Sequence, residues 1–75
     1  MEKKFKLKGH IIDSLILSKV LDKIEALGID CYAADVKVGA RRNDFSEAVF
    51  IVETDDESKM EEAVKLAKMH GAVEI

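Results

Sequence analysis

The spacing of hydrophobic residues changes twice along this chain from every second position to every third or fourth, and this order limits the possible folds more than any other feature. In residues 3–9, hydrophobic residues alternate with lysines, and this period of two predicts a half-buried strand. From Leu17 to Leu27 they recur at helical spacing. Gly28 then offers a residue that ends a helix in the left-handed conformation, so a helix is predicted up to Leu27.

Two segments in the middle of the chain predict a pair of strands. Residues 46–54 are hydrophobic on both faces, which is typical of a central strand with a neighbour on each side. The connection over residues 39–46 is longer than most hairpin loops, and long loops often carry function. Residues 30–39 alternate, and four of them are predicted to share one face: Tyr32, Ala34, Val36 and Val38.

The last third of the chain predicts a helix and a short final strand. Within residues 54–71, Thr54 and Glu57 have the spacing of a capping box, and basic residues precede the closing glycine. Residues 72–75 alternate again, with Val73 and Ile75 predicted to point inward. The stripe of the helix that is predicted to be buried consists of Met60, Ala63, Val64 and Ala67.

The resulting order, βαββαβ, predicts an α+β fold, the ferredoxin-like sandwich. Its antiparallel sheet has the strand order 4-1-3-2, with two helices on one face. No linker or repeat interrupts the chain, so residues 1–75 are predicted to form a single domain. A domain of this size is too small to enclose an enzyme cleft by itself, and we predict that it is not catalytic in isolation.

Composition and motifs argue against several classes of function. The net charge is −3, no stretch is apolar enough to span a membrane, and the single cysteine, Cys31, is expected to be a small buried hydrophobe. A cytoplasmic location without membrane contact is therefore predicted. Zinc-type cysteine and histidine spacings and glycine-rich phosphate loops are absent, which predicts no metal and no cofactor. The acidic balance and an open sheet face without aromatic rings predict no nucleic-acid partner.

Polar residues at the loop positions are predicted to meet at one end of the sheet. In this topology the end of the first strand, the start of the first helix and the hairpin between strands two and three share one rim. A histidine there binds anions or protons near neutral pH, and arginines grip carboxylates or phosphates through two hydrogen bonds. The residues predicted to contact a ligand or partner are Gly9, His10, Asp13, Arg41, Arg42 and Asp44, and His70 is expected on the same rim.

Structural interpretations of these residues stay open beside the functional one. Asp13 and Ser14 are preferred N-cap residues, and capping is the stronger interpretation for both, with the helix beginning between Ser14 and Ser18. His10 also fits a surface histidine that follows a strand. Arginines in loops are commonly only solvated.

Two short motifs resemble a known family. The stretch "KLKGHIIDSLIL" contains a G-H-x-x-D corner formed by Gly9, His10 and Asp13. The stretch "VKVGARRNDFSEAVFIVE" contains G-x-x-x-x-D-x-S-x-A, formed by Gly39, Asp44, Ser46 and Ala48. Both stretches resemble the region beside the saccharopine dehydrogenase part of bifunctional lysine-oxoglutarate reductase/saccharopine dehydrogenases (LOR/SDH). They are more similar still to the N-terminal segment of archaeal proteins that resemble ornithine cyclodeaminases.

The resemblance implies a non-catalytic accessory or regulatory domain of an amino-acid-metabolising enzyme. It adds Ser46 to the predicted contact residues and implies a catalytic domain or subunit as the partner. Because family members continue past this region, the chain is expected to be an excised N-terminal domain of a longer protein. Three alternatives stay open: a self-assembly module that pairs through its open sheet face or edge strands, a ligand-binding domain that acts alone, and an enzyme in which His10 is a general acid or base with Asp13 orienting it.

Overall fold

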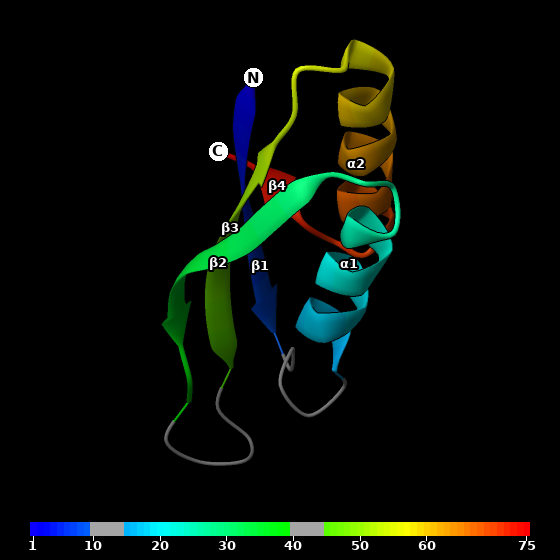
Figure 1. Cartoon of the computed structure of the whole chain (residues 1–75). Coiled ribbons are helices and arrows are strands. Elements are labelled where there is room, and N and C mark those ends of the chain that lie inside the picture. Colours follow the sequence, from blue (N-terminus) through cyan, green and yellow to red (C-terminus); the bar gives the residue numbers. More distant parts are fainter. Residues whose placement is uncertain (10–14, 40–44) are drawn as a thin grey trace.

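The computed structural model describes residues 1–9, 15–39 and 45–75, and within them the predicted elements follow in the predicted order. They are β1 (Glu2–Gly9), α1 (Ile16–Glu25), β2 (Asp30–Lys37), β3 (Ser46–Glu53), α2 (Glu57–Met69) and β4 (Val73–Glu74). The sheet has the order β2-β3-β1-β4, and all neighbouring strands are antiparallel. This is the predicted order 4-1-3-2, and both helices cover the same face (Figure 1), so the predicted α+β fold is confirmed.

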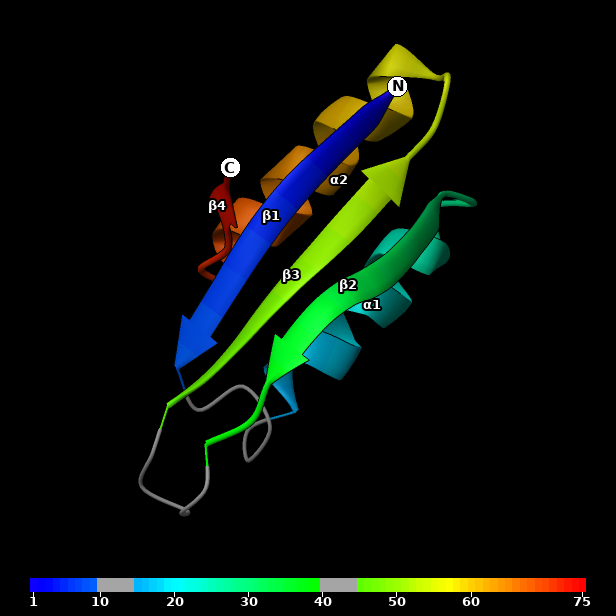
Figure 2. The ribbon, with the colours of Figure 1, turned by 90° about the vertical axis from the view of Figure 1, so that its left-hand side faces the viewer.

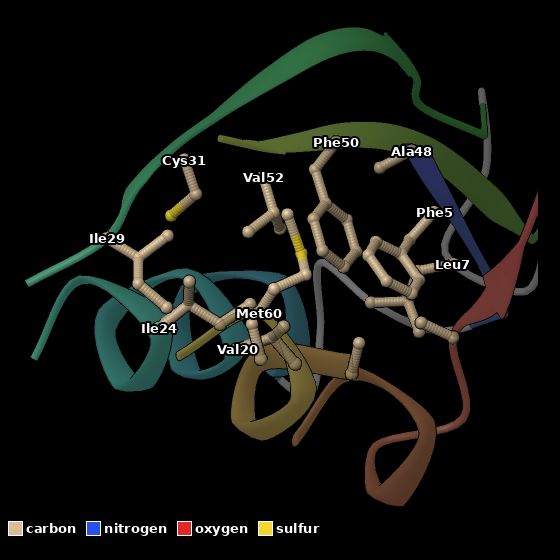
Figure 3. Close-up of a cluster of buried hydrophobic side chains, with 13 residues drawn as sticks. Phe5, Leu7, Val20, Ile24, Ile29, Cys31, Ala48, Phe50, Val52 and Met60 are labelled. Atoms are coloured by element: carbon tan, nitrogen blue, oxygen red, sulfur yellow. The ribbon is translucent and has the colours of Figure 1, made fainter. Parts of the chain in front are cut away.

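β3 lies at the centre of the sheet because it has hydrophobic residues for both faces. It pairs with β1 along its whole length and with β2 on its other side. Phe50 stacks on Phe5 of β1 with ring centroids 5.4 Å apart, and both rings are completely buried between sheet and helices (Figure 3). The core cluster consists of Phe5, Leu7, Val20, Ile24, Ile29, Cys31, Ala48, Phe50, Val52, Met60, Ala63, Ala67 and Ala72.

The stripe predicted for α2 is confirmed at three positions, and its predicted cap is wrong. Val64 is only partly buried, whereas the other three stripe residues belong to the core. The N-cap is Asp56, whose Oδ1 accepts a hydrogen bond of 3.1 Å from the backbone N–H of Lys59. Thr54 lies two residues before this N-cap. Its Oγ1 accepts a hydrogen bond from the Asp56 N–H and not from a residue inside the helix.

A register shift in β2 makes the predicted common face of this strand wrong. Tyr32 pairs with Ile51, and Val36 pairs with Ala48, with the shift between Ala33 and Asp35. Ile51 and Ala48 point to opposite sides of β3 because three positions separate them. A β-bulge adds one residue to the strand and so reverses the alternation. Tyr32 therefore lies on the face away from the helices, while Val36 lies on the helix-facing side.

The inward orientation predicted for the last hydrophobic residues is also wrong. Val73 pairs with Lys6, Glu74 pairs with the buried Phe5, and the Ile75 N–H donates to the carbonyl of Lys4. This register turns Val73 and Ile75 toward the open face, where 62% and 63% of their surfaces are exposed. Ala72 fills the core position instead.

In the described part of the chain, neither helix has the length and hydrophobicity needed to cross a membrane.

Candidate functional site

The sheet end at which both loop motifs are anchored is the candidate site. Gly9, the last residue of β1, pairs with Ser46, the first residue of β3. The backbone N–H of Gly39 donates a hydrogen bond of 3.1 Å to Ser46 Oγ, which ties the end of β2 to the same place. α1 begins at this end of the sheet as well (Figure 1). We call this end the rim and define it by the described residues Gly9, Leu15, Val36, Val38, Gly39, Phe45 and Ser46.

Five of the seven predicted contact residues lie outside the described residues: His10, Asp13, Arg41, Arg42 and Asp44. Their contact with a ligand or partner stays a prediction. Gly9 and Ser46 are described and lie side by side. His70, which was expected on the rim, follows α2, and its ring Nδ1 lies 2.8 Å from the carbonyl oxygen of Leu66.

Gly9 and Ser46 have structural tasks at the rim. Gly9 has a φ of +131°, a conformation that side-chain-bearing residues rarely adopt, and an added Cβ would meet no atom within 4 Å. The backbone conformation, not the close approach of a neighbour, therefore requires glycine. Ser46 is 5% exposed, and its hydroxyl accepts the Gly39 hydrogen bond, so it holds the two strand ends of the hairpin together.

Exposed hydrophobic side chains concentrate at the rim. Leu15, Val38 and Phe45 are 61%, 65% and 62% exposed. Val36 is 41% exposed although it pairs with Ala48, which is 1% exposed on the same side of the sheet. A helix of the length of α1 extends about 15 Å, whereas an eight-residue strand extends about 26 Å. α1 therefore cannot cover the whole helix-facing side of β2.

Leu15 combines exposure with backbone strain. It occupies the N-cap position of α1 with φ 59° and ψ 21°, and its side chain makes no capping hydrogen bond. The predicted capping by Asp13 or Ser14 lies outside the described residues and stays a prediction. Leucine rarely adopts the left-handed conformation, which costs about 1–2 kcal/mol. An exposed leucine held in such a conformation buries little hydrophobic surface within this domain.

Reactive groups of the described residues do not gather at the rim. Cys31, near the opposite end of β2, is buried, and its thiol donates to the carbonyl of Leu21 at 3.5 Å. Burial, followed by the negative charges of Glu25, Asp30 and Asp22, raises the pKa of Cys31 to about 11. The thiol is therefore protonated at neutral pH, and the interpretation of Cys31 as a small buried hydrophobe is confirmed. Across residues 1–9, 15–39 and 45–75, no three His, Cys, Asp or Glu side chains form a group suited to a metal ion.

Sequence reasoning missed the hydrophobic part of the rim and the position of Tyr32. In the sequence, Val38 and Phe45 lie on either side of the polar residues of a long loop. Hydrophobic residues beside such a loop could have been predicted to be exposed. Tyr32 lies on the open face and is 46% exposed, which corrects the assumption that this face has no aromatic ring. Cys31 is buried opposite Val52 on the helix-facing side. Because neighbouring side chains of a strand point to opposite faces, Tyr32 then lies on the open face opposite Ile51.

Comparison with known proteins connects this fold to enzymes of amino-acid metabolism. Residues 2–75 match the family described as the LOR/SDH bifunctional enzyme conserved region. An ornithine cyclodeaminase of Methanopyrus kandleri is 42% identical over 74 residues, which cover 99% of this chain and 18% of that protein. An ornithine cyclodeaminase of Methanocaldococcus jannaschii is 40% identical over 70 residues, which cover 93% of this chain and 16% of that protein. The chain thus spans less than a fifth of these relatives.

Solved structures contain the same fold as a small part of larger proteins. Unliganded AgrE superimposes with a TM-score of 0.94 at 27% identity, over 100% of this chain and 11% of AgrE. AgrE has also been solved as a ternary complex with ornithine and NAD+. ArgZ, an arginine dihydrolase from the ornithine-ammonia cycle in cyanobacteria, gives a TM-score of 0.92 at 25% identity, over 100% of this chain and 12% of ArgZ.

Proposed function

The chain belongs to the family of the LOR/SDH bifunctional enzyme conserved region, and we propose that it is a non-catalytic accessory domain that docks through its rim to the catalytic part of an amino-acid-metabolising enzyme. The enzyme is proposed to be saccharopine dehydrogenase-like or ornithine cyclodeaminase-like. In the matched relatives and solved structures this region makes up 11–18% of the protein, so each of them also contains other parts.

The observation that carries the proposal is the concentration of exposed hydrophobic residues at the rim. Leu15, Val36, Val38 and Phe45 come from the start of α1, the end of β2 and the start of β3, and these element ends lie at one end of the sheet (Figure 1). Hydrophobic patches of this kind mark contact surfaces because their burial against a partner is favourable. The strained backbone of Leu15 supports the same function, since strain is retained where a residue serves a contact.

Binding between this chain and a catalytic partner tests the proposal. The partner is the remaining part of an ornithine cyclodeaminase-like relative, prepared without its own copy of this region. Isothermal titration calorimetry is expected to show binding that Leu15→Asn weakens by about tenfold. Asparagine removes the hydrophobic side chain and tolerates the left-handed conformation, so this variant keeps the fold.

Met69→Gln is the matched control, because Met69 is 78% exposed and lies at the end of α2 instead of at the rim. We expect its affinity to equal that of the unchanged chain. No binding at all, or an equal loss for the two variants, would refute docking through the rim.

The same rim is proposed to bind a small amino-acid-like ligand if His10, Arg41 and Arg42 converge there with Asp13 and Asp44. Calorimetry with lysine, ornithine, arginine and 2-oxoglutarate tests this version. Heat from one of these compounds that disappears in His10→Ala supports it. Silence from all four, with His10→Ala unchanged in binding the catalytic part, removes it.

A further inference from the structure

The sheet face turned away from both helices has a pattern of its own. Figure 2 looks onto this open face, with the helices behind the sheet. Cross-strand pairing aligns its side chains in four rows that run across the strands. From one end to the other, the rows are Asp30, Glu53 and Glu2; Tyr32, Ile51, Lys4 and Ile75; Asp35, Val49, Lys6 and Val73; and Lys37, Glu47 and Lys8.

The two middle rows form a hydrophobic band. Tyr32, Val73 and Ile75 are between 46% and 63% exposed. Ile51 is only 8% exposed, although it lies outside the core cluster and points away from the helices. On β1 both middle rows hold lysines, and on β2 one of them holds Asp35. The hydrophobic contact area therefore falls on β3, β4 and Tyr32. Neither helix covers this band, because both lie behind the sheet (Figure 2).

The two outer rows carry opposite charge. The first row contains three carboxylates and no base. At the other end, Lys8 and Lys6 lie 3.4 and 3.8 Å from the two oxygens of Glu47, which they neutralise, and Lys37 adds a further positive charge. The open face is therefore acidic at one end, hydrophobic in the middle and basic at the other end.

We propose that the open face is the interface with a second copy of this chain, packed face to face about a twofold axis that lies across the strands. This axis reverses the strand direction, so the acidic row of each copy lies over the basic row of the other. A twofold axis along the strands would instead stack acidic row on acidic row, which like-charge repulsion opposes. The end rows are then complementary, and the hydrophobic residues of β3 and β4 meet at the centre. β1 lies over β1 as well, which brings Lys4 of each copy over Lys6 of the other and lowers the expected affinity.

In the same arrangement, Tyr32 of one copy lies over a hollow in the open face of the other. Because the proposed axis lies across the strands, β2 of one copy lies over β2 of the other, and the Tyr32 row lies over the Asp35 row. There the bulge of β2 leaves a hollow of about 140 Å³, lined by Lys6, Asp35, Lys37, Glu47, Ala48 and Val49. A tyrosine placed over this hollow has hydrophobic contact with Val49 and a carboxylate within reach of its hydroxyl. The contact occurs twice in the dimer.

The size of the face sets the expected affinity. Three strands about 4.8 Å apart and about 26 Å long, with the two-residue β4 beside them, present roughly 400 Å² on each copy. The total of about 800 Å² is in the range of weak, transient contacts. We therefore expect a weak dimer with a Kd in the micromolar range.

Sedimentation equilibrium of the 75-residue chain between about 10 µM and 1 mM tests the proposal. We expect a monomer–dimer equilibrium that Tyr32→Ala weakens by about tenfold and that Met69→Gln leaves unchanged. A monomer at 1 mM, or a dimer that is indifferent to Tyr32→Ala, overturns the proposal. A Leu15→Asn variant that dimerises normally separates this interface from the docking rim.

Charge reversal tests the direction of packing. Asp30 of one copy is proposed to lie over Lys37 of the other, so Asp30→Lys and Lys37→Asp are each expected to weaken the homodimer several-fold. An equimolar mixture of the two variants restores the affinity, because both contacts then join opposite charges. Failure of the mixture to associate better than either variant alone overturns the antiparallel arrangement, since any loss of folding would be the same in both measurements.

Discussion

At the scale of single residues, the buried thiol of Cys31 is expected to make the folded chain less stable as the pH becomes alkaline. The pKa of Cys31 is raised from 9.0 to about 11 in the folded chain, mainly by burial. Below pH 9 the thiol is neutral in both states. Between pH 9 and 11 the unfolded chain loses this proton first, so the free energy of unfolding falls as pH rises, by about 2–3 kcal/mol in all.

Urea unfolding of the unchanged chain and of Cys31→Ala from pH 7 to 11 measures this contribution. The stability advantage of the unchanged chain is expected to shrink above pH 9, while every other ionisable group is present in both proteins and cancels in the difference. Parallel pH curves would mean that burial does not hold the proton on Cys31.

Backbone conformation at single residues was only partly predictable. Gly28 was expected to end α1, and its φ of +79° fits that role. Nothing in the residue type of Leu15 indicates a left-handed conformation, and the nearby Asp13 and Ser14 are better N-caps by chemistry. Residue type alone therefore did not predict the backbone conformation at Leu15.

At the scale of elements, Asp56 is expected to hold the start of α2. Asp56→Ala removes the acceptor for the Lys59 N–H and leaves that donor without its 3.1 Å hydrogen bond. The expected loss is about 1 kcal/mol in the free energy of unfolding. Asp55→Ala is the control, because Asp55 is fully exposed and forms only a surface ion pair of 3.2 Å with the terminal amine. Its loss is expected to be clearly smaller than that of Asp56→Ala, because water screens an exposed ion pair. Equal losses in chemical denaturation would show that Asp56 does not act as a cap.

The elements themselves were predictable where the hydrophobic pattern admits one solution. The two apolar faces of residues 46–54 indicated a central strand, and β3 is central. The pattern failed in β2, because a bulge between Ala33 and Asp35 changes which side chains share a face without changing their spacing in the sequence. At α2, Thr54 and Asp56 both had suitable side chains, and only the geometry of the first turn distinguishes them. The pairing of Gly9 with Ser46 puts the ends of the two sequence motifs side by side, at the end of the sheet where the sequence placed them. The exposed hydrophobic residues there could not be predicted, because their exposure depends on how much of the sheet α1 covers.

At the scale of the whole molecule, β3 serves two surfaces. Its even-numbered positions, Ala48, Phe50 and Val52, build the core, and Val49 and Ile51 face the opposite side. A domain of 75 residues is expected to have only about 4–11 kcal/mol of stability. One strand therefore carries much of the fold and, in our proposal, the centre of the contact with a second copy.

Substitutions at adjacent positions of β3 should separate these two contributions. Phe50→Ala removes a completely buried ring that stacks on Phe5, and it is expected to cost about 3–5 kcal/mol, enough to leave much of the chain unfolded. Val49→Ala removes a partly buried side chain from the open face, and it is expected to cost about 1 kcal/mol or less while lowering the dimer affinity. Urea denaturation measures the first effect and sedimentation the second. If Val49→Ala destabilised the monomer as much as Phe50→Ala, the open face would be part of the folding core, and its hydrophobic band would need no second copy to explain it.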